Sequence, residues 1–305
     1  MSGATDAAAA GRGRYVGLLL LAGITLVWGV NWPAMKLAVA EVPVWTFRSI
    51  CLASGGIGLL AIARLGGQRL RIPAAEIGPL LLTAAFNITG WHLASGFGLV
   101  YLEAGRASII AFTMPLWAAV MAVPLLGERL SRAAAAGLVV GLVGLAVLVL
   151  PDWRGLIAAP LGVLFMLGAA LSWAAGTVAL KYYRWSISTA ALAGWQLVLG
   201  GVPVALGALW FDSGFAPETV SATAWLATLY AALLPMIFCH WAWFKVVGLY
   251  PAAIAGIGTL AIPAVGVVSS AAALGEPIGP DVVGALVLVL AALALVLIVP
   301  ARRRL

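Results

Sequence analysis

Residues 28–36 read WGVNWPAMK, and residues 173–181, 145 positions further along the chain, read WAAGTVALK. The tryptophans that begin the two stretches match, and so do the lysines that end them, Lys36 and Lys181. Beyond this point the offset between matching residues becomes 148 and stays there. At that offset three further matches follow in order: His92 with His240, Pro115 with Pro263, and LGE at 126–128 with LGE at 274–276. A duplicated half with one three-residue insertion explains the whole series.

The composition of the chain suits a lipid bilayer. Hydrophobic residues make up 64% of the 305 residues, charged residues make up 9%, and the mean hydropathy is +1.12. A soluble domain carries about 25% charged residues, whereas one membrane span needs about 20 apolar residues. The apolar runs predict ten spans, at 15–37, 43–63, 77–100, 104–126, 133–150, 159–181, 188–210, 222–246, 252–274 and 280–299. Both cysteines, Cys51 and Cys239, lie inside such runs, which argues against a disulfide framework.

Basic residues are distributed unevenly between the two ends of the predicted spans. With the N-terminus in the cytoplasm, thirteen of the seventeen lysines and arginines fall at inner ends, three fall at outer ends, and Arg48 lies inside a span. The positive-inside rule then places both termini in the cytoplasm. The net charge of +7 is therefore a topology signal and does not indicate nucleic-acid binding. Arg12 and Arg14 precede the first apolar run, but no small-residue cleavage site follows, so we expect a retained first helix.

Each half of the duplication holds five predicted spans, and an odd number makes the second copy cross the membrane in the opposite sense. We expect an all-α integral membrane protein with ten transmembrane helices, built as two inverted five-helix repeats around a central cavity. Inverted repeats are typical of transporters, whose substrate sites lie near the bilayer midplane between the repeats. The predicted organisation is a cytoplasmic N-terminal tail at 1–14, a first repeat at 15–150, a linker at 151–158, a second repeat at 159–299 and a basic cytoplasmic tail at 300–305.

Several of these stretches resemble one family of membrane transporters. WGVNWPAMK at 28–36, followed by VPVWTFRS with Pro43 and Arg48, resembles the opening of EamA-family proteins in the drug/metabolite transporter superfamily. TMPLWAAVMAVPLLGERLS at 113–131 looks like the fourth helix of that family and the turn after it. The chain looks most like bacterial amino-acid exporters of the YddG type, which handle aromatic and other neutral amino acids. The resemblance implies ten helices, a central cavity between the halves, a bacterial inner membrane, and peripheral fifth and tenth helices.

The first span contains three residues that hydrocarbon disfavours, namely Asn31, Pro33 and Lys36. Pro33 removes a backbone donor and disturbs the carbonyl about one turn earlier, near Gly29. Asn31 either hydrogen-bonds that freed carbonyl or faces a substrate cavity, since irregular backbone at membrane depth is tolerated only against protein or a water-filled space. Lys36 is expected to snorkel to the outer interface.

Two matched pairs of residues lie inside the second half of each repeat. Pro115 and Pro263 lie near the centres of spans four and nine and predict kinks, which serve either packing or a hinge between the halves. His92 and His240 have ordinary pKa values near neutrality, and their matching positions favour a role in lining the cavity as much as a packing role. No Asp or Glu lies deep in a span, so the histidines are the candidates if protons are coupled to transport. A facilitator or an exchanger is equally consistent with the sequence.

Arg48 lies about one turn inside the second span, where a charge costs less than the roughly 2.5–3.5 kcal/mol of the bilayer centre. It either contacts carbonyls at the end of the first span or recruits a substrate carboxylate. Aromatic residues within the spans would either fill the bundle or form an apolar wall for an aromatic or aliphatic side chain. The predicted cavity lining consists of Asn31, Trp91, His92, Trp117, Trp173, Thr177, His240 and Trp243.

The fifth span and residues 282–299 of the tenth carry no polar side chain. Gly137, Gly141 and Gly144 form a small-residue stripe suited to close helix contact. We therefore expect these two spans to be outer, structural helices.

The sequence as a whole predicts an inner-membrane exporter of small metabolites, with neutral or aromatic amino acids as its substrates, that works by alternating access. A multidrug or other-metabolite exporter of the same fold is the alternative. A channel or an intramembrane enzyme is disfavoured, because matched prolines suit alternating access and the chain lacks HExxH, GxSxG and paired membrane carboxylates. We expect no catalytic residue, metal or cofactor. The expected partners are a small-molecule substrate and the bilayer, and the choice between monomer and homodimer stays open.

Overall fold

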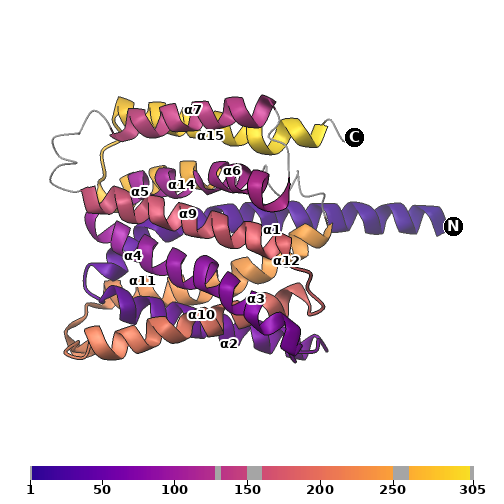
Figure 1. The fold of residues 1–305 in the computed structure, drawn as a ribbon, viewed down its shortest axis with the longest axis horizontal. Coiled ribbons are helices and arrows are strands. Elements are labelled where there is room, and N and C mark those ends of the chain that lie inside the picture. Colours follow the sequence, from indigo (N-terminus) through magenta and orange to yellow (C-terminus); the bar gives the residue numbers. More distant parts are fainter. Residues whose placement is uncertain (1, 128–131, 150–159, 250–260, 303–305) are drawn as a thin grey trace.

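The computed structural model describes residues 2–127, 132–149, 160–249 and 261–302, and these are overwhelmingly helical (Figure 1). In chain order the elements are α1 (Ser2–Val39), α2 (Val44–Leu65), α3 (Ala74–Ala84), η1 (Ala85–Gly90), α4 (Trp91–Tyr101), α5 (Ala104–Ala111), α6 (Met114–Leu126), α7 (Arg132–Val149), α9 (Pro160–Tyr182), α10 (Thr189–Phe211), η3 (Pro217–Thr219), α11 (Ala222–Leu233), η4 (Leu234–Cys239), α12 (His240–Leu249), α14 (Ile262–Leu274) and α15 (Pro280–Arg302). The predicted linker at 151–158, Glu128 of the first LGE motif and the last three residues of the basic tail lie outside the described residues.

The helices follow the apolar runs of the sequence. Six of them are long and apolar enough to cross a membrane: Val16–Val39, Val44–Leu65, Ala104–Leu126, Pro160–Tyr182, Thr189–Phe211 and Ala222–Trp243. Three shorter apolar helices accompany them: Ala135–Leu148, Ile262–Leu274 and Pro280–Leu295. The prediction of an all-helical, multi-pass membrane protein is therefore confirmed. Because α1 begins at Ser2, the described part of the predicted tail at 1–14 continues the helix of the first span.

The prolines at 115 and 263 begin helices and do not bend them. The fourth predicted span is divided into α5 and α6 by a turn at Phe112 and Thr113. Pro115 lies in the first turn of α6, and Pro263 lies in the first turn of α14. A proline in the first turn removes no intrahelical hydrogen bond, and its fixed φ suits a helix start. The interruption of the fourth span thus lies at Phe112 and Thr113, just before Pro115, and the hinge role of both prolines stays a prediction.

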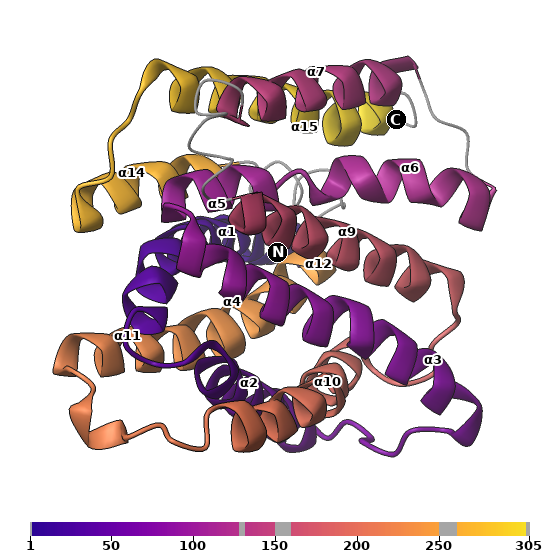
Figure 2. The ribbon, with the colours of Figure 1, turned by 60° about the vertical axis from the view of Figure 1, so that its left-hand side comes forward.

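Two helix pairs lie at opposite edges of the bundle in Figure 1, α7 with α15 and α2 with α10. On α7, a Cβ at Gly141 would lie 3.3 Å from Ala292, and one at Gly144 would lie 2.9 Å from Leu288. The small-residue stripe therefore lets α7 approach α15 closely, as expected. Gly56 of α2 likewise lies against the backbone of α10. The remaining helices, with α1 and α9 among them, fill the space between these pairs (Figure 2).

Helix α1 runs through Pro33 without ending. The carbonyl that Pro33 deprives of its helical donor is that of Gly29, four residues earlier. The hydroxyl of Ser269, on α14, lies 3.5 Å from this carbonyl and 3.1 Å from the carbonyl of Gly266, so its single proton serves one of the two at a time. The suggestion that Asn31 satisfies this carbonyl finds no support in the hydrogen bonds of the described residues.

Lys36 ties the end of α1 to the end of α4. Its Nζ donates to the carbonyls of Leu99 at 2.6 Å, Leu102 at 2.9 Å and Val100 at 3.4 Å. The last carbonyls of a helix lack intrahelical donors, and a cation there is favoured by the helix dipole. Lys36 therefore has a specific role as a cap for the end of α4, and its snorkelling to the outer interface stays a prediction.

Candidate functional site

A π-helical turn lies directly before each of the two histidines. The first, η1, precedes His92 by two residues, and the second, η4, precedes His240 by one. The two turns occupy nearly matching positions in the two halves of the chain. A π-helical turn inserts one residue into a helix, and such turns are frequent at functional sites. They also rotate the residues that follow relative to those before. The direction in which each histidine points around the helix axis is therefore set by the turn.

Side chains satisfy backbone groups at both π-helical turns. The carbonyl of Phe86 accepts the backbone N–H of Trp91, five residues later, and the hydroxyl of Ser172 on α9 at 2.7 Å. In η4 the Nδ1 of His240 lies 3.0 Å from the carbonyl of Pro235. With its proton on Nδ1, the His240 ring donates to this carbonyl and keeps Nε2 as an acceptor. Both turns are thereby held by specific hydrogen bonds.

Aromatic contacts cross between the two halves next to these turns. The Trp28 ring meets the His240 ring edge-on with centroids 6.0 Å apart, and the Trp243 ring lies 6.2 Å from Trp28. In the reverse direction, Trp173 of the second half lies 5.1 Å from Trp91 of the first, at an interplanar angle of 60°. Because Trp28 and Trp173 are matching residues, each half places the same tryptophan against the π-turn helix of the other half.

Arg48 is buried where α1, α2 and α4 meet, with 2% of its surface exposed. Its Nη2 donates to Ser95 Oγ at 2.8 Å and its Nη1 donates to the Met35 sulfur at 3.3 Å. The third donor, Nε, has no hydrogen-bond partner among the described residues, and neither described ion pair includes Arg48. The predicted contact with carbonyls at the end of the first span is wrong, because two side chains occupy the guanidinium instead.

His92 and Ser95 lie one turn apart on α4. His92 is 4% exposed, and its Nδ1 has no hydrogen-bond partner in the part of the chain that the structure describes. Because Ser95 accepts a hydrogen bond from Arg48, His92 lies on the same part of α4 as the contact with the guanidinium.

Asn31 approaches the same place from α1. It lies one turn before Met35, which contacts Arg48, and it is 8% exposed. Its Oδ1 is likewise without a hydrogen-bond partner among the described residues. We refer to these four polar side chains as the Arg48 cluster: Asn31, Arg48, His92 and Ser95.

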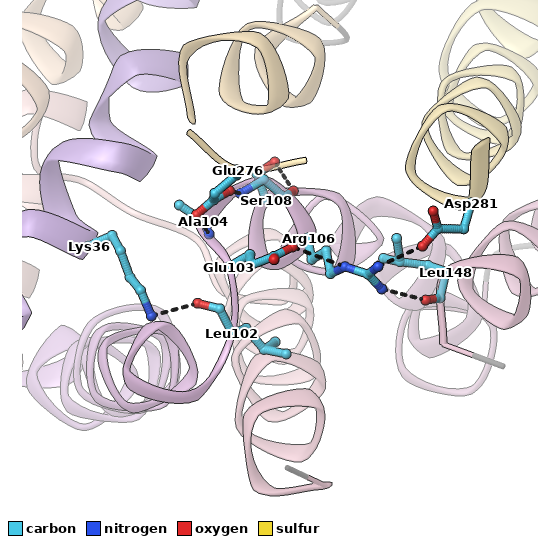
Figure 3. A network of polar contacts seen from close by, with 10 residues as sticks. Lys36, Leu102, Glu103, Ala104, Arg106, Ser108, Leu148, Glu276 and Asp281 are labelled. Carbon is cyan, nitrogen blue, oxygen red and sulfur yellow. Dashed lines mark hydrogen bonds and ion pairs between the residues drawn. The ribbon is translucent and has the colours of Figure 1, made fainter. Parts of the chain in front are cut away.

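A second polar network joins the halves at the end of the bundle near Lys36 (Figure 3). The two carboxylate oxygens of Glu276, between α14 and α15, accept the backbone N–H groups of Ala104 at 2.6 Å and Gly105 at 2.8 Å. These N–H groups belong to the first turn of α5, where unpaired donors and the helix dipole favour a carboxylate. We call this contact the Glu276 clamp.

Arg106 extends this network toward the outer helix pair (Figure 3). Its guanidinium pairs with Asp281 of α15 at 2.6 Å and with Glu103 at 3.2 Å. It also donates to the carbonyl of Leu148 on α7 at 3.0 Å. One side chain thus fastens α5 to both α7 and α15.

The two halves of the chain match one and the same family. The sequence profile of the EamA-like transporter family matches residues 15–150 and, separately, residues 160–298. The chain belongs to this family. The EamA-family protein is therefore a multi-pass membrane protein built from two related units.

Known relatives of this EamA-family protein carry transporter names. It is 34% identical over 284 residues to the uncharacterized transporter YvbV of Bacillus subtilis (strain 168), covering 91% of this chain and 90% of that protein. It is 28% identical over 287 residues to a probable amino-acid metabolite efflux pump of Salmonella typhimurium, covering 88% of this chain and 91% of the other. A solved crystal structure without a functional name has the same fold, with a TM-score of 0.66 and 22% identity over 94% of this chain and 98% of that one.

The EamA-family protein brings most of its predicted lining residues into the contacts described above. Six of them are Asn31, Trp91, His92, Trp173, His240 and Trp243. The other two lie apart from these groups. Trp117 donates from Nε1 to the Thr113 hydroxyl at 3.1 Å, and Thr177 is exposed on α9. The assignment of all eight to a cavity lining stays a prediction.

Sequence reasoning missed two polar residues, Ser95 and Asn87. Asn87, in η1, is 3% exposed, and its Oδ1 has no hydrogen-bond partner among the described residues. A Cβ on Gly176 of α9 would overlap the Asn87 amide. The second copy of WGVNWPAMK therefore has glycine where the first has Asn31, because an amide from η1 already fills that place. An amide inside the apolar run FNITG at 86–90 was the available signal.

Proposed function

We propose that this EamA-family protein exports small metabolites, with neutral and aromatic amino acids as substrates, by alternating access in the bacterial inner membrane. The observation that carries the proposal is the pair of π-helical turns, one in each half, that lie directly before His92 and His240, each with a tryptophan of the other half packed beside it. Transporters built from repeats bind their substrates at the interface between those repeats. The two histidines mark such an interface.

The substrate class rests on two observations. A relative covering most of this chain is named a probable amino-acid metabolite efflux pump. Next to the histidines, the Trp28 and Trp173 contacts provide apolar ring surface suited to aromatic or aliphatic side chains. We therefore place neutral and aromatic amino acids ahead of charged metabolites.

The proposed architecture is ten spans in two inverted repeats, and a pair of exchanged contacts supports it. Glu41 accepts the backbone N–H of Ser221 at 2.6 Å and its hydroxyl at 2.7 Å. Glu76 accepts the backbone N–H of Ser186 at 3.0 Å and also its hydroxyl. Ser186 is the match of Glu41, 145 positions later, and α11 is the match of α3, with starts 148 positions apart. Each contact therefore joins a residue just before α2 or α10 to the start of α11 or α3 in the other half. Because Glu41 and Glu76 flank α2 at its opposite ends, the two equivalent contacts belong to opposite faces of the membrane.

The ends of α2 and α10 support the same arrangement. Thr46, in the first turn of α2, donates its N–H and its hydroxyl to Asp212, each at 2.8 Å, just after α10 ends. Ser188, which caps the start of α10, donates to Gln68, just after α2 ends. Equivalent helices that pack antiparallel in this way are expected around an axis in the membrane plane. Together with the excess of basic residues at the predicted inner ends, this arrangement supports a cytoplasmic location for both termini.

Counterflow into proteoliposomes tests the proposal. Purified protein is reconstituted, and uptake of labelled tryptophan, phenylalanine, leucine and a lipophilic cation is measured with and without a pH gradient. We expect saturable counterflow of the amino acids, and we expect Asn31→Leu to impair it while expression in the membrane stays near normal. Saturable flux of the lipophilic cation alone would indicate a drug exporter, non-saturable flux would indicate a channel, and either result would overturn the proposal. A response to the pH gradient would identify proton coupling.

A further inference from the structure

The Arg48 cluster buries a positive charge without a counter-charge. Arg48 is 2% exposed inside a membrane bundle, and the described ion pairs belong to Arg106 alone. A buried charge is strongly unfavourable unless a partner of opposite sign compensates it, and intramembrane charges mark substrate pathways by default. A hydroxyl and a thioether satisfy two of its donor groups but do not neutralise the guanidinium.

The unpartnered atoms of the cluster are of two complementary kinds. Arg48 Nε is a donor on a cation and requires an anionic acceptor. Asn31 Oδ1 is an acceptor, and so is His92 Nδ1 in the neutral tautomer that carries its proton on Nε2. These two atoms require a donor, and a cationic donor suits them best. The group of atoms therefore matches a ligand that has both a carboxylate and an ammonium.

Glycine at position 96 lets the backbone of α4 pack directly against the guanidinium of Arg48. A Cβ on Gly96, the residue after Ser95, would lie 3.2 Å from Arg48 Nε and 2.6 Å from a methyl of Val44. Any side chain at this position would therefore crowd the unpartnered face of the guanidinium. The exposures of 2% for Arg48, 4% for His92 and 8% for Asn31 mean that the cluster is closed in this conformation. A ligand reaches it when the helices around it move, as alternating access requires.

We propose that the Arg48 cluster binds the α-carboxylate and α-ammonium groups of a zwitterionic amino acid. Arg48 and Ser95 take the carboxylate, and Asn31 and His92 take the ammonium. This inference rests on the proposed function and adds the part of the substrate that is recognised. Compounds that lack either charged group are rejected, whereas a range of neutral side chains is accepted.

Competition with labelled tryptophan in proteoliposomes tests this recognition. The competitors are tryptophan, tryptamine, which lacks the carboxylate, and indole-3-propionate, which lacks the ammonium. In the wild type we expect each analogue to compete at least about tenfold more weakly than tryptophan, because a site built for a polar group rejects ligands without it. Arg48→Gln should raise the KM for tryptophan about tenfold or more and remove the preference over tryptamine. Asn31→Leu should weaken the preference over indole-3-propionate instead.

Two further variants keep the test decisive. Arg64→Gln changes an exposed arginine on the same helix and should match the wild type. Ser95→Ala, a milder change, should raise the KM for tryptophan several-fold if Arg48→Gln does not fold, as judged by gel filtration. Wild-type KM and unchanged selectivity in the folded Arg48 or Ser95 variant would overturn the inference and leave the proposed function intact. Failure of the wild type to transport any amino acid would overturn the proposed function itself.

Discussion

Gly176 and Gly168 lie about two helical turns apart on α9, and only Gly176 has a neighbour where a side chain would go. A Cβ at 176 would overlap the Asn87 amide and lie 2.9 Å from the Asn87 backbone nitrogen, whereas nothing lies within 4 Å of a Cβ at 168. We expect Gly176→Ala to lower the free energy of unfolding by about 1–3 kcal/mol through overpacking. Gly168→Ala should be neutral or should raise it by about 0.5–1 kcal/mol. Thermal unfolding in detergent micelles measures both, and adding Asn87→Ala to Gly176→Ala should restore part of the loss.

Lys36 has a structural role that the sequence did not predict, as a cap for the end of α4. Three carbonyls near the end of α4 receive its ammonium, so Lys36→Met leaves them without this donor. Hydrogen bonds to charged groups contribute about 1.5–3 kcal/mol, and we expect a loss of unfolding free energy in that range. Hydrogen exchange should also become faster for the amides of the last turn of α4. Protection that stays at the wild-type level would mean that water replaces the ammonium there.

At the scale of elements, the contact between Glu41 and Ser221 links the turn after α1 to the start of α11. The hydroxyl and backbone N–H of Ser221 lower the pKa of the Glu41 carboxyl below its ordinary value. A lowered pKa in the folded state means that the contact stabilises the fold above the ordinary carboxyl pKa and is lost as the pH falls through the lowered one. Glu41→Gln should therefore lower the Tm slightly at pH 7, and the difference should shrink toward zero on acidification to about pH 3. Because the carboxyl is fully exposed, high salt should reduce the difference as well.

Helix positions could be predicted from the sequence, but the interruptions within helices could not. Apolar runs fix where helices lie, because only helices satisfy their own backbone groups in lipid. The π-helical turns at 85–90 and 234–239 leave hydropathy unchanged, so no apolar pattern marks them. Pro115 correctly indicated that the fourth span is interrupted. The interruption lies a few residues before the proline, in the turn at Phe112 and Thr113. The histidines were found by duplication, whereas Ser95 became visible only through its bond to Arg48.

At the scale of the whole molecule, the duplication of the sequence carried the most information. It predicted an interface between the two halves, and the contacts of Trp28 with His240 and of Trp173 with Trp91 agree with this. It could not anticipate that equivalent contacts would use different residues, since Glu41 meets Ser221, whereas Ser186, the match of Glu41, meets Glu76. Each half needs one carboxylate and one hydroxyl at such a contact, and either side can supply either group. Two-fold geometry therefore constrains the pair and not the single residue.

The Glu276 clamp offers a test of how the two halves move. Because Glu276 closes the first turn of α5, transport by alternating access requires this contact to break when the outer face opens. Ser108 lies one turn further along α5, is fully buried, and donates to the carbonyl of Gly105. In a background with Cys51 and Cys239 replaced by alanine, we expect Ser108→Cys to react slowly with a membrane-impermeant maleimide added from outside. Glu276→Gln replaces one acceptor oxygen with a donor that opposes a backbone N–H, which should speed this labelling.

The expected increase is about tenfold, because weakening the closed state by about 1.4 kcal/mol raises the open population tenfold. Arg132→Gln, an exposed change at the start of α7, serves as the control and should leave the labelling rate unchanged. Faster labelling from the cytoplasmic side only would show that the chain has the opposite orientation in the membrane. Labelling that is slow from both sides with Glu276→Gln would mean that α5 stays packed on α14 for reasons other than this carboxylate. In that case the packing of Gly266 against Ser108 would be the contact that governs opening. A Cβ on Gly266 would lie only 2.9 Å from the Ser108 hydroxyl.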